Sequence, residues 1–462
     1  MNSLQQLTAV RAHQLPPTVT FPAVRTVQQG STVIEHLDET PPFYLALIDR
    51  LRAAQAVLAS QLTDDELIIL LDEAARRWRD PAHPFRRQAL SILPALTGLA
   101  PSMIEEGLDH RLAQLTMERL TRVSDETADR LARQTRTLQG PPVVLLVVAG
   151  HIPGLVIDEL AALLLARSAA LIRPSGRDPM IPALFVRTLA ELDPRLAELL
   201  AVGWWPKEAD AISSAVGAAV DMVVASGDDA TIADLARHAN RIIGYGHRRS
   251  VALIGADALT DAETLARQLA RDVCWYKQQG CLSPHVVYVE EDGAISPRAF
   301  AKQVASALGH EMSHCPPSAI PIEAGSAILQ LRADVEFREA AGGAFFAPSP
   351  EVGQLAGGTV LYDPDPAPRP SPGYRTLWVK PVARMEAALE ALAPWRGRIE
   401  SIGLALSDER LTALQPIIDQ FTPSRLTPIG TMQEPPLRWR LIDQGLLLRL
   451  TQWTGTISNS HS

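Results

Sequence analysis

The feature that most constrains the fold is a change of pattern after Gly140. From there, short continuous runs of apolar residues alternate with amphipathic segments: VVLLVVAG precedes GLVIDELAALLLARSA, ALIRPS precedes IPALFVRTLAEL, and DMVVASG precedes DATIADLARHANR. Continuously apolar strands separated by helices are typical of a parallel sheet that is covered on both faces. The pattern therefore predicts an α/β domain with a parallel sheet.

A second series of the same kind follows a turn-like segment at residues 244–250 (GYGHRRS). Here the expected strands are SVALIG, HVVYVEED, TLWVKPV and IESIGLAL, and helical segments lie between them. We expect a second α/β domain, with the turn-like segment as the seam. Ligands in this class bind in clefts at the carboxyl ends of parallel strands, and two such domains would place a cleft between them.

Before Gly140 the pattern is helical. From Phe43 to about Arg136, apolar residues recur at intervals of three and four, with charged residues between them. This region carries no chemical motif, so we expect it to have a structural role, packing against or supporting the rest of the chain.

Composition and charge exclude several classes of protein. The chain of 462 residues is 47% hydrophobic, and its 43 Lys and Arg against 52 Asp and Glu give a formal charge of −9, which does not suit a nucleic-acid surface. Three cysteines cannot form a disulfide framework, and the odd count fits a reducing compartment. The most apolar stretch, Val143 to Ala149, is far shorter than the ~20 residues that span a bilayer, and the N-terminus lacks the apolar core of a secretory signal. We expect a cytoplasmic protein with no membrane span and no nucleic-acid partner.

Cys281 is the first candidate for chemistry. It lies in QQGCLSP, a loop between an expected helix and an expected strand, where Gly280 allows close approach of a substrate and Pro284 prevents a helix from continuing. The alternative is that Cys281 is a small buried apolar residue, as most unpaired cysteines are. Cys274 fits a core position and Cys315 a loop without a role. No spaced set of Cys and His offers four zinc ligands, so no metal is expected.

Three loops after expected strands offer weaker candidates. His151 is the only polar side chain of the turn in VVAGHIPG, and it can equally be an exposed loop histidine. Arg173, Ser175 and Arg177 follow the strand in ALIRPSGRDP, where they suit ribose hydroxyls or a phosphate, although two loop arginines are more often a solvated surface. Gly227, in VVASGDD, is compatible with an anion at a helix N-terminus, but no glycine-rich nucleotide motif accompanies it.

Taken in order, these segments resemble the aldehyde dehydrogenase superfamily, and more closely its acyl-CoA reductase branch, which includes the fatty-acid reductase of bacterial bioluminescence. The most specific segment is QQGCLSP. The resemblance runs from about residue 140 to the C-terminus, through AGHIPG, ALIRPSGRDP, VVASGDD, GYGHRRSVALI, LARDVCWYKQQGCLSPHVVYVE and FTPSRLTPIGTMQEPPLRWRLIDQGLLLRL.

The resemblance implies an aldehyde dehydrogenase-like α/β fold with two parallel-sheet domains. It implies an N-terminal helical region packed on the cofactor domain (1–138), a nicotinamide-nucleotide domain with a five-stranded parallel sheet (139–246), a catalytic thiol domain (247–427) and a C-terminal return segment (428–462). It places Cys281 on the catalytic cysteine and His151 on the position that donates to the oxyanion. The cofactor-binding residues that it implies are Arg173, Pro174, Ser175, Ser226 and Gly227.

This sequence departs from the superfamily pattern at three places. His151 replaces an asparagine, and a neutral imidazole still has one N–H to donate. Asp228 replaces a serine, and its carboxylate would repel a pyrophosphate unless it turns away. No Glu occurs around residues 244–250, where hydrolytic members keep a general base; His247 is there, with a supporting role at best.

The missing Glu favours acyl reduction, because hydrolysis of a thioester intermediate needs water activated by a base and reduction does not. We expect NADPH-dependent reduction of an acyl-CoA or acyl-protein thioester to the aldehyde; NADH is the other possible cofactor, and Arg173 and Arg177 favour NADPH through its 2′-phosphate. The alternatives are an aldehyde or semialdehyde dehydrogenase, a nucleotide-independent cysteine acyl carrier, and a non-catalytic scaffold. The resemblance also suggests a homo-oligomer and an acyl-activating synthetase as partner.

Overall fold

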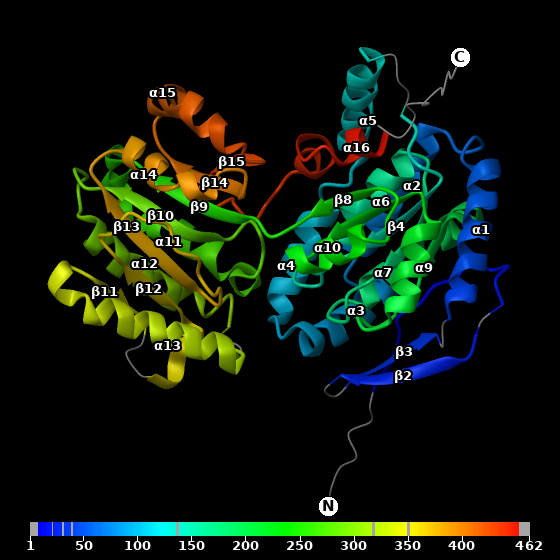
Figure 1. The fold of residues 1–462 in the computed structure, drawn as a ribbon, viewed down its shortest axis with the longest axis horizontal. Helices are drawn as coiled ribbons and strands as arrows, with labels where there is room; N and C mark the ends of the chain where they lie inside the picture. The colour runs from blue at the N-terminus through cyan, green and yellow to red at the C-terminus, as the bar shows by residue number, and fades with distance from the viewer. Residues whose placement is uncertain are drawn as a thin grey trace, which may run out of the picture. The chain divides into compact units, whose positions relative to one another are not determined.

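The computed structural model describes residues 8–20, 22–29, 32–37, 40–134, 138–316, 319–348 and 352–451. The chain divides into two compact units (Figure 1). The first comprises residues 1–246 and 436–462, and the second comprises residues 247–435. The boundary between Gly246 and His247 lies within the turn-like segment, and the chain returns to the first unit at Pro436.

The first unit is built on a five-stranded sheet in the order β6–β5–β4–β7–β8, in which every pair of neighbours is parallel. The five-stranded parallel sheet implied by the resemblance is therefore present. The strands are β4 (Val143–Val147), β5 (Ala169–Arg173), β6 (Leu200–Val202), β7 (Met222–Ser226) and β8 (Ile242–Tyr245). The helices that follow or connect them are α6 (Val156–Leu165), α7 (Met180–Leu192), α8 (Pro194–Leu199), α9 (Asp210–Ala219) and α10 (Asp229–Ala236).

The strands of this sheet are apolar because both faces are covered. All five residues of β4 are buried, as are the first four of β5 and of β7. Helix α6 is buried along its whole length, including Asp158 and Glu159. A sheet and helix of this kind need no alternation of polar residues, which is why the sequence shows continuous apolar runs.

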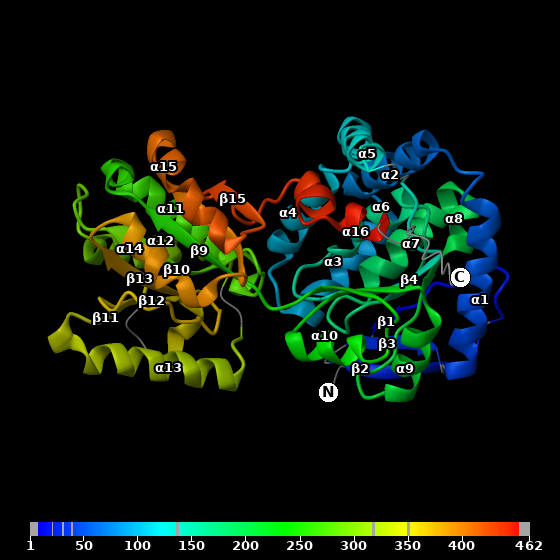
Figure 2. The same ribbon diagram turned by 45° about the horizontal axis from the view of Figure 1, so that its top comes forward.

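The region before the first sheet, expected to be helical over 1–138, contains three strands as well as helices. Figure 2 shows a small sheet in the order β1–β3–β2, made of β1 (Thr8–Arg11), β2 (Val24–Gln29) and β3 (Thr32–Leu37). The strands are short and only β3 alternates buried with half-buried residues, so the pattern is weak in sequence. The helices are α1 (Pro41–Leu58), α2 (Asp64–Arg79), α3 (Pro84–Thr97), α4 (Pro101–Leu112) and α5 (Met117–Ala132).

The second unit contains a seven-stranded sheet in the order β11–β12–β13–β10–β9–β14–β15, parallel except for β11. The expected strands SVALIG, HVVYVEED, TLWVKPV and IESIGLAL are β9, β10, β13 and β14. The strands are β9 (Arg249–Ile254), β10 (Pro284–Glu290), β11 (Ala344–Phe346), β12 (Thr359–Tyr362), β13 (Thr376–Val382), β14 (Ile399–Ala405) and β15 (Arg425–Pro428). The helices are α11 (Ala262–Cys274), α12 (Pro297–Glu311), α13 (Ile322–Phe337), α14 (Met385–Ala391) and α15 (Asp408–Ile418).

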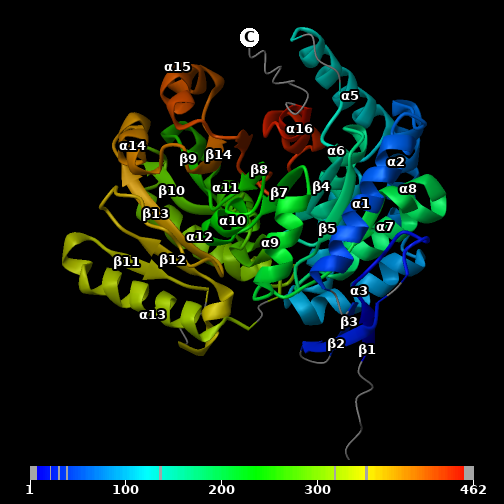
Figure 3. The same ribbon diagram turned by 45° about the vertical axis from the view of Figure 1, so that its right-hand side comes forward.

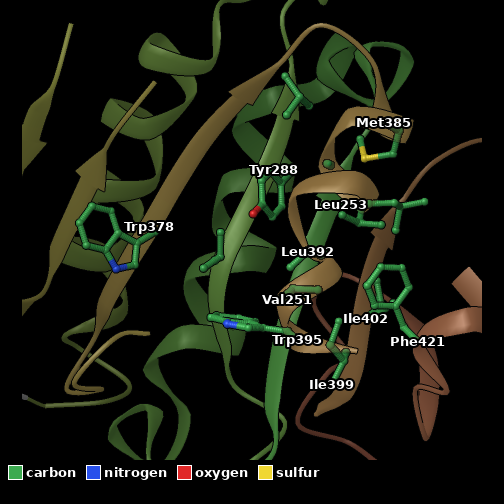
Figure 4. Close-up of a cluster of buried hydrophobic side chains, with 14 of the residues drawn as sticks. Val251, Leu253, Tyr288, Trp378, Met385, Leu392, Trp395, Ile399, Ile402 and Phe421 are labelled. Carbon is green, nitrogen blue, oxygen red and sulfur yellow. The ribbon is translucent and has the colours of Figure 1, made fainter. Parts of the chain in front are cut away.

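A cluster of buried apolar side chains holds the second unit together. Figure 4 shows strand residues such as Val251, Tyr288 and Ile402 in one cluster with Met385 and Leu392, which come from α14 and the residue that follows it. At roughly 25 cal/mol for each Å² of buried apolar surface, a cluster of this kind is the main source of stability for the sheet. It gives the loops at the strand ends a rigid support.

In the described ranges, no helix combines the length and the apolar content that crossing a bilayer requires.

Candidate active site

Cys281 is the exposed thiol of the chain. It follows α11 and a short helical turn, Trp275–Gln278, and it precedes β10. The other two cysteines are buried and none of the three forms a disulfide. Burial raises the pKa of the Cys274 thiol to about 12, so Cys274 stays protonated near neutral pH. Exposure therefore distinguishes Cys281 and argues against its being a core residue.

The loop begins with backbone conformations that L-residues rarely adopt. Tyr276, Lys277 and Gln278 have φ values of 48°, 57° and 60°. Each such residue costs on the order of 1–2 kcal/mol, so the surrounding structure must hold the run in place. The run ends α11 abruptly and turns the chain toward β10.

The Gln278 side chain holds this turn. It is 2% exposed, and its Nε2 donates to the carbonyl oxygens of Pro284 and Thr376, both at 2.8 Å. Its Oε1 accepts the Thr376 N–H at 2.7 Å. One amide thus joins the start of the Cys281 loop to the first residues of β10 and β13.

Further hydrogen bonds fix the loop around the thiol itself. The Ser250 hydroxyl donates to the Cys281 carbonyl oxygen at 2.7 Å and accepts the Ser401 N–H at 3.1 Å. Two residues after the thiol, the Ser283 hydroxyl accepts the Gln433 amide at 3.0 Å. The position of Cys281 is therefore set by β9, β14 and the loop that follows β15.

The turn before β13 closes the other side of the loop. The Tyr374 N–H donates to the Lys277 carbonyl oxygen at 2.8 Å. Gly373 has a φ of 81°, a left-handed conformation that favours glycine because it strains residues with a Cβ. Nearby, His285 Nδ1 accepts the Ser371 N–H at 3.1 Å, and burial lowers the pKa of His285 to about 4. The imidazole is therefore neutral and serves as an acceptor.

Cys281 lies at the amino end of its sheet, because its loop precedes β10. Of the segments that hold it, Ser371–Arg375 comes before β13 and Ser250 is the second residue of β9, whereas Gln433 comes after β15. In this unit the candidate thiol therefore lies at the edge opposite the carboxyl ends of the strands. In the first unit the candidates follow β4, β5 and β7, at the carboxyl ends.

In the first unit, the His151 turn packs directly on the loop after β5. A Cβ at Gly150 would lie 2.3 Å from the Ser175 Oγ and 2.9 Å from the Arg177 Cβ. The buried Asp178 joins the same two loops by accepting the Gly154 N–H at 3.0 Å. The structure thus brings His151, Ser175 and Arg177 close together. The sequence of either loop alone does not indicate this proximity.

His151 is exposed, and its surroundings favour the neutral ring. The pKa of His151 is lowered because its environment partly desolvates the imidazolium and because the Arg177 guanidinium repels a second positive charge. A neutral imidazole carries one N–H, which is what an oxyanion donor needs.

Arg173 is the last residue of β5 and is held by the segment after β6. Its Nε and Nη2 donate to the Trp205 carbonyl oxygen at 3.3 and 3.2 Å, and its guanidinium lies 5.1 Å from the centre of the Trp205 ring. Pro174 is buried behind it, and the Ser175 Oγ accepts the Arg177 N–H at 3.2 Å. A cation on an aromatic face at this edge can meet a sugar phosphate.

The loop after β7 has a different environment. The Ser226 hydroxyl donates to Glu159 Oε1 at 3.2 Å and accepts from Arg440 at 3.1 Å. Gly227 donates its N–H to the Tyr245 carbonyl oxygen at 3.3 Å. Asp228 Oδ1 accepts the Thr231 N–H at 2.6 Å, so this carboxylate caps α10 instead of projecting away from the helix.

Two carboxylates lie beside residues 244–250: that of Asp229, whose Oδ1 would lie 2.5 Å from a Cβ at Gly246, and that of Glu400, which pairs with Arg248. His247 is exposed. The Glu400 carboxylate of β14 contacts this segment, but it is buried, pairs with Arg248 at 3.4 Å and accepts the Ser424 hydroxyl at 2.7 Å. Within the described ranges, no group of three His, Cys, Asp or Glu residues could hold a metal ion.

Sequence reasoning selected Cys281 and the loops after β4, β5 and β7, and it missed the residues that hold them. Gln278, Ser250 and Gln433 are ordinary polar residues in sequence, far apart along the chain. The adjacent glutamines of QQG were the one available signal. Cys281 belongs to the second unit and the remaining candidates to the first.

The acyl-CoA reductase (LuxC) family model matches residues 59–436. Among curated proteins, long-chain acyl-protein thioester reductase 2 of Photobacterium leiognathi is 26% identical over 148 residues, or 31% of this chain and 30% of that protein. The long-chain acyl-protein thioester reductase of Vibrio harveyi is 22% identical over 256 residues, or 50% of this chain and 52% of that protein. The aligned stretches thus span about a third to a half of these relatives.

Two solved structures have the same fold. Aldehyde dehydrogenase 21 from Physcomitrella patens superposes with a TM-score of 0.70 at 14% identity, covering 91% of this chain and 90% of that one. A NAD-dependent benzaldehyde dehydrogenase from Corynebacterium glutamicum gives 0.69 at 16% identity, covering 95% and 96%. The expected aldehyde dehydrogenase-like α/β fold is confirmed.

Proposed function

Because the chain belongs to the acyl-CoA reductase (LuxC) family, we propose that it reduces a fatty acyl thioester to the aldehyde with NADPH, through an acyl-enzyme on Cys281. The observation that carries this proposal is the Cys281 loop. The thiol is exposed, and hydrogen bonds from Gln278, Ser250 and Gln433 fix the chain on both sides of it. A nucleophile needs both access and a fixed position.

In the first step, the Cys281 sulfur attacks the carbonyl carbon of the acyl thioester. The negative charge that develops on the oxygen is held by the Cys281 backbone N–H and by His151, whose lowered pKa keeps its ring neutral. The S–C bond to coenzyme A or to a carrier protein breaks, and its thiol leaves with a proton. The acyl group remains on Cys281.

In the second step, the acyl thioester must be reduced and not hydrolysed. When bound, the reduced nicotinamide supplies the hydride. The resulting hemithioacetal then collapses: its C–S bond breaks, the aldehyde forms, and the Cys281 thiolate takes up a proton from solvent. The absence of a Glu from residues 244–250, and the ion pairing of Glu400, support reduction because no base is assigned to activate water.

The residues of the first unit suit a nicotinamide nucleotide. We assign the adenosine ribose and its phosphate to Arg173, Pro174 and Ser175, since the Arg173 cation lies on an aromatic ring at the carboxyl end of β5. We assign the pyrophosphate to the Ser226–Gly227 loop. The capping role of Asp228 supports this assignment, because its carboxylate is turned to the Thr231 N–H.

The substrate class rests on the relatives' names. They are long-chain acyl-protein thioester reductases, so both an acyl-protein and an acyl-CoA are candidate donors. We further propose a cytoplasmic location, a homo-oligomer and an acyl-activating synthetase as partner, all from the family resemblance.

The test is to incubate the purified protein with a long-chain acyl-CoA and NADPH, and to follow nicotinamide absorbance together with aldehyde release. We expect NADPH oxidation matched by aldehyde, and no reduction by Cys281→Ala. Parental rates in Cys281→Ala would refute the covalent route. An acyl-enzyme without NADPH oxidation would indicate an acyl carrier, NAD(P)-dependent oxidation of an aldehyde alone would indicate a dehydrogenase, and no acyl-enzyme at all would indicate a scaffold.

Replacing NADPH by NADH at equal concentration tests the cofactor. We expect faster turnover with NADPH, because Arg173 and Arg177 offer positive charge to a 2′-phosphate. Faster turnover with NADH would contradict this assignment.

A further inference from the structure

A buried ion pair lies directly behind the loop after β7. Glu159 of α6 is 0% exposed and Arg440 of the returning C-terminal segment is 6% exposed. Arg440 Nη2 donates to Glu159 Oε1 and to the Ser226 hydroxyl, and Ser226 donates to the same Glu159 oxygen. The three side chains form a closed set of hydrogen bonds at the last residue of β7.

Tyr245 fastens the same loop from β8. The Arg440 guanidinium lies 4.1 Å from the centre of the Tyr245 ring, and the Tyr245 carbonyl oxygen accepts the Gly227 N–H. Ser226 and Tyr245 are also register partners in the sheet. Arg440 therefore contacts both residues that fix the position of Gly227.

Arg440 is presented by an unusual turn. Residues Trp439–Asp443 form a π-helix, in which the Gln444 N–H donates to the Trp439 carbonyl oxygen at 2.7 Å. The Gln444 side chain accepts from Arg440 Nη1 at 2.6 Å. The π-helix and α16 (Leu446–Thr451) pack on α6, as Figure 3 shows for α16. π-turns of this kind often occur at functional sites.

Stability alone is a poor explanation for this arrangement. Removing a carboxylate and a guanidinium from water is costly, and apolar residues of similar volume are often no less stable at such a site. The charged pair instead orients the Ser226 hydroxyl and, through Tyr245, the backbone of Gly227.

We propose that Arg440 is a positioning residue for the nicotinamide nucleotide, acting on the Ser226–Gly227 loop through Ser226 and Tyr245. This inference rests on the cofactor assignment made above. It gives the C-terminal segment a part in binding the cofactor, although no residue of that segment was among the cofactor candidates.

The test is the affinity for NADPH, measured by calorimetric titration of the full chain. In Arg440→Met we expect the Kd for NADPH to rise at least tenfold. Acylation of Cys281 by a long-chain acyl-CoA without nucleotide is the internal control, since this step needs no nucleotide and the hydrogen bonds of Arg440 described above go to Glu159, Ser226 and Gln444. It should stay within twofold of the parent.

Two further variants separate positioning from folding. Arg440→Met leaves Glu159 buried without its cation, so that variant can lose stability. In Arg440→Met with Glu159→Gln the buried charge is gone; we expect the Tm to recover toward the parental value while the Kd stays high. Arg438→Met is the control, because Arg438 lies in the same segment and pairs with Glu126 of α5 and with Asp443, whereas Arg440 pairs with Glu159. It should bind NADPH within twofold of the parent.

The outcomes are distinct. A parental Kd in Arg440→Met, or in the double variant once its Tm has recovered, would overturn the positioning role and leave the proposed function intact. If the parent chain itself bound no NADPH, the cofactor assignment would fail and this inference with it.

Discussion

Gln278 illustrates how one buried side chain can hold a nucleophile in place. It supplies two donors and one acceptor to backbone groups at the starts of β10 and β13, just after a run of left-handed residues. The strain of that run is held by these hydrogen bonds, so the loop geometry depends on them.

In Gln278→Met, a side chain of similar size that cannot make these bonds, the Pro284 carbonyl and the Thr376 N–H lose their hydrogen bonds to Gln278, although the Thr376 carbonyl keeps that from the Ser371 hydroxyl. Each such loss costs about 1–3 kcal/mol. We expect a lower urea midpoint and a changed rate of Cys281 alkylation by iodoacetamide. Gln330→Met, on the exposed side of α13, is the control. Parental stability and alkylation in Gln278→Met would show that the loop does not need this residue.

Arg177 is expected to lower the pKa of His151. Its guanidinium is one of the two causes that lower the pKa of His151. In Arg177→Gln the imidazolium is repelled less, so the pKa of His151 should rise and the acid limb of the rate profile should move to higher pH. An NMR titration measures this, with His151→Gln to assign the resonance. Arg122→Gln on α5 is the control, and an unmoved His151 titration in Arg177→Gln would contradict the account.

His151 itself can be tested by removal. If it donates to the oxyanion, His151→Ala should lose on the order of 3 kcal/mol of transition-state stabilisation, which is typical of one such donor. The measurement is kcat/KM for the acyl thioester. Turnover equal to the parent would remove His151 from the mechanism.

At the scale of elements, the second unit places the proposed nucleophile, Cys281, before strand β10. The order helix, Cys281, strand is visible in the sequence and places the thiol at the amino end of β10. The general rule that ligands bind at the carboxyl ends of parallel strands predicts the opposite edge of the sheet. What no local pattern could show is that Ser250, Tyr374 and Gln433, from three other segments, converge on the same loop. Those contacts depend on the order of the strands in the sheet, which local sequence patterns do not indicate.

The turn before β13 makes the second unit sensitive to acid. His285 has a pKa of about 4 in the folded chain, against an ordinary value of 6.5. As pH falls from 6.5 to 4, the unfolded chain therefore binds a proton that the folded chain does not, and stability falls. At about 1.4 kcal/mol for each pKa unit, the loss approaches about 3 kcal/mol near pH 4 and is absent above pH 7.

In His285→Asn the side-chain oxygen can still accept the Ser371 N–H, but it does not titrate. We expect the urea midpoint of this variant to fall less than that of the parent between pH 7 and pH 4.5. The exposed His310, substituted as His310→Asn, is the control. Identical pH dependence in His285→Asn and the parent would show that this imidazole does not limit acid stability.

At the scale of the whole molecule, the periodicity of the sequence predicted the α/β class and most strands of both large sheets. It did so because strands buried on both faces must be continuously apolar. The same reasoning failed for β1, β2 and β3, which are short and partly exposed. It also could not reveal the Glu159–Arg440 pair, whose members are 281 residues apart.

The proposed reaction requires that Cys281 carries the acyl group. The most direct measurement is to mix the protein with a long-chain acyl-CoA in the absence of nucleotide, determine its intact mass and map the modified peptide. We predict one acyl adduct per chain on the QQGCLSP peptide, and we expect the acyl group to be released as aldehyde when NADPH is added. An adduct on Cys274 or Cys315, or aldehyde formation with Cys281 never acylated, would contradict it.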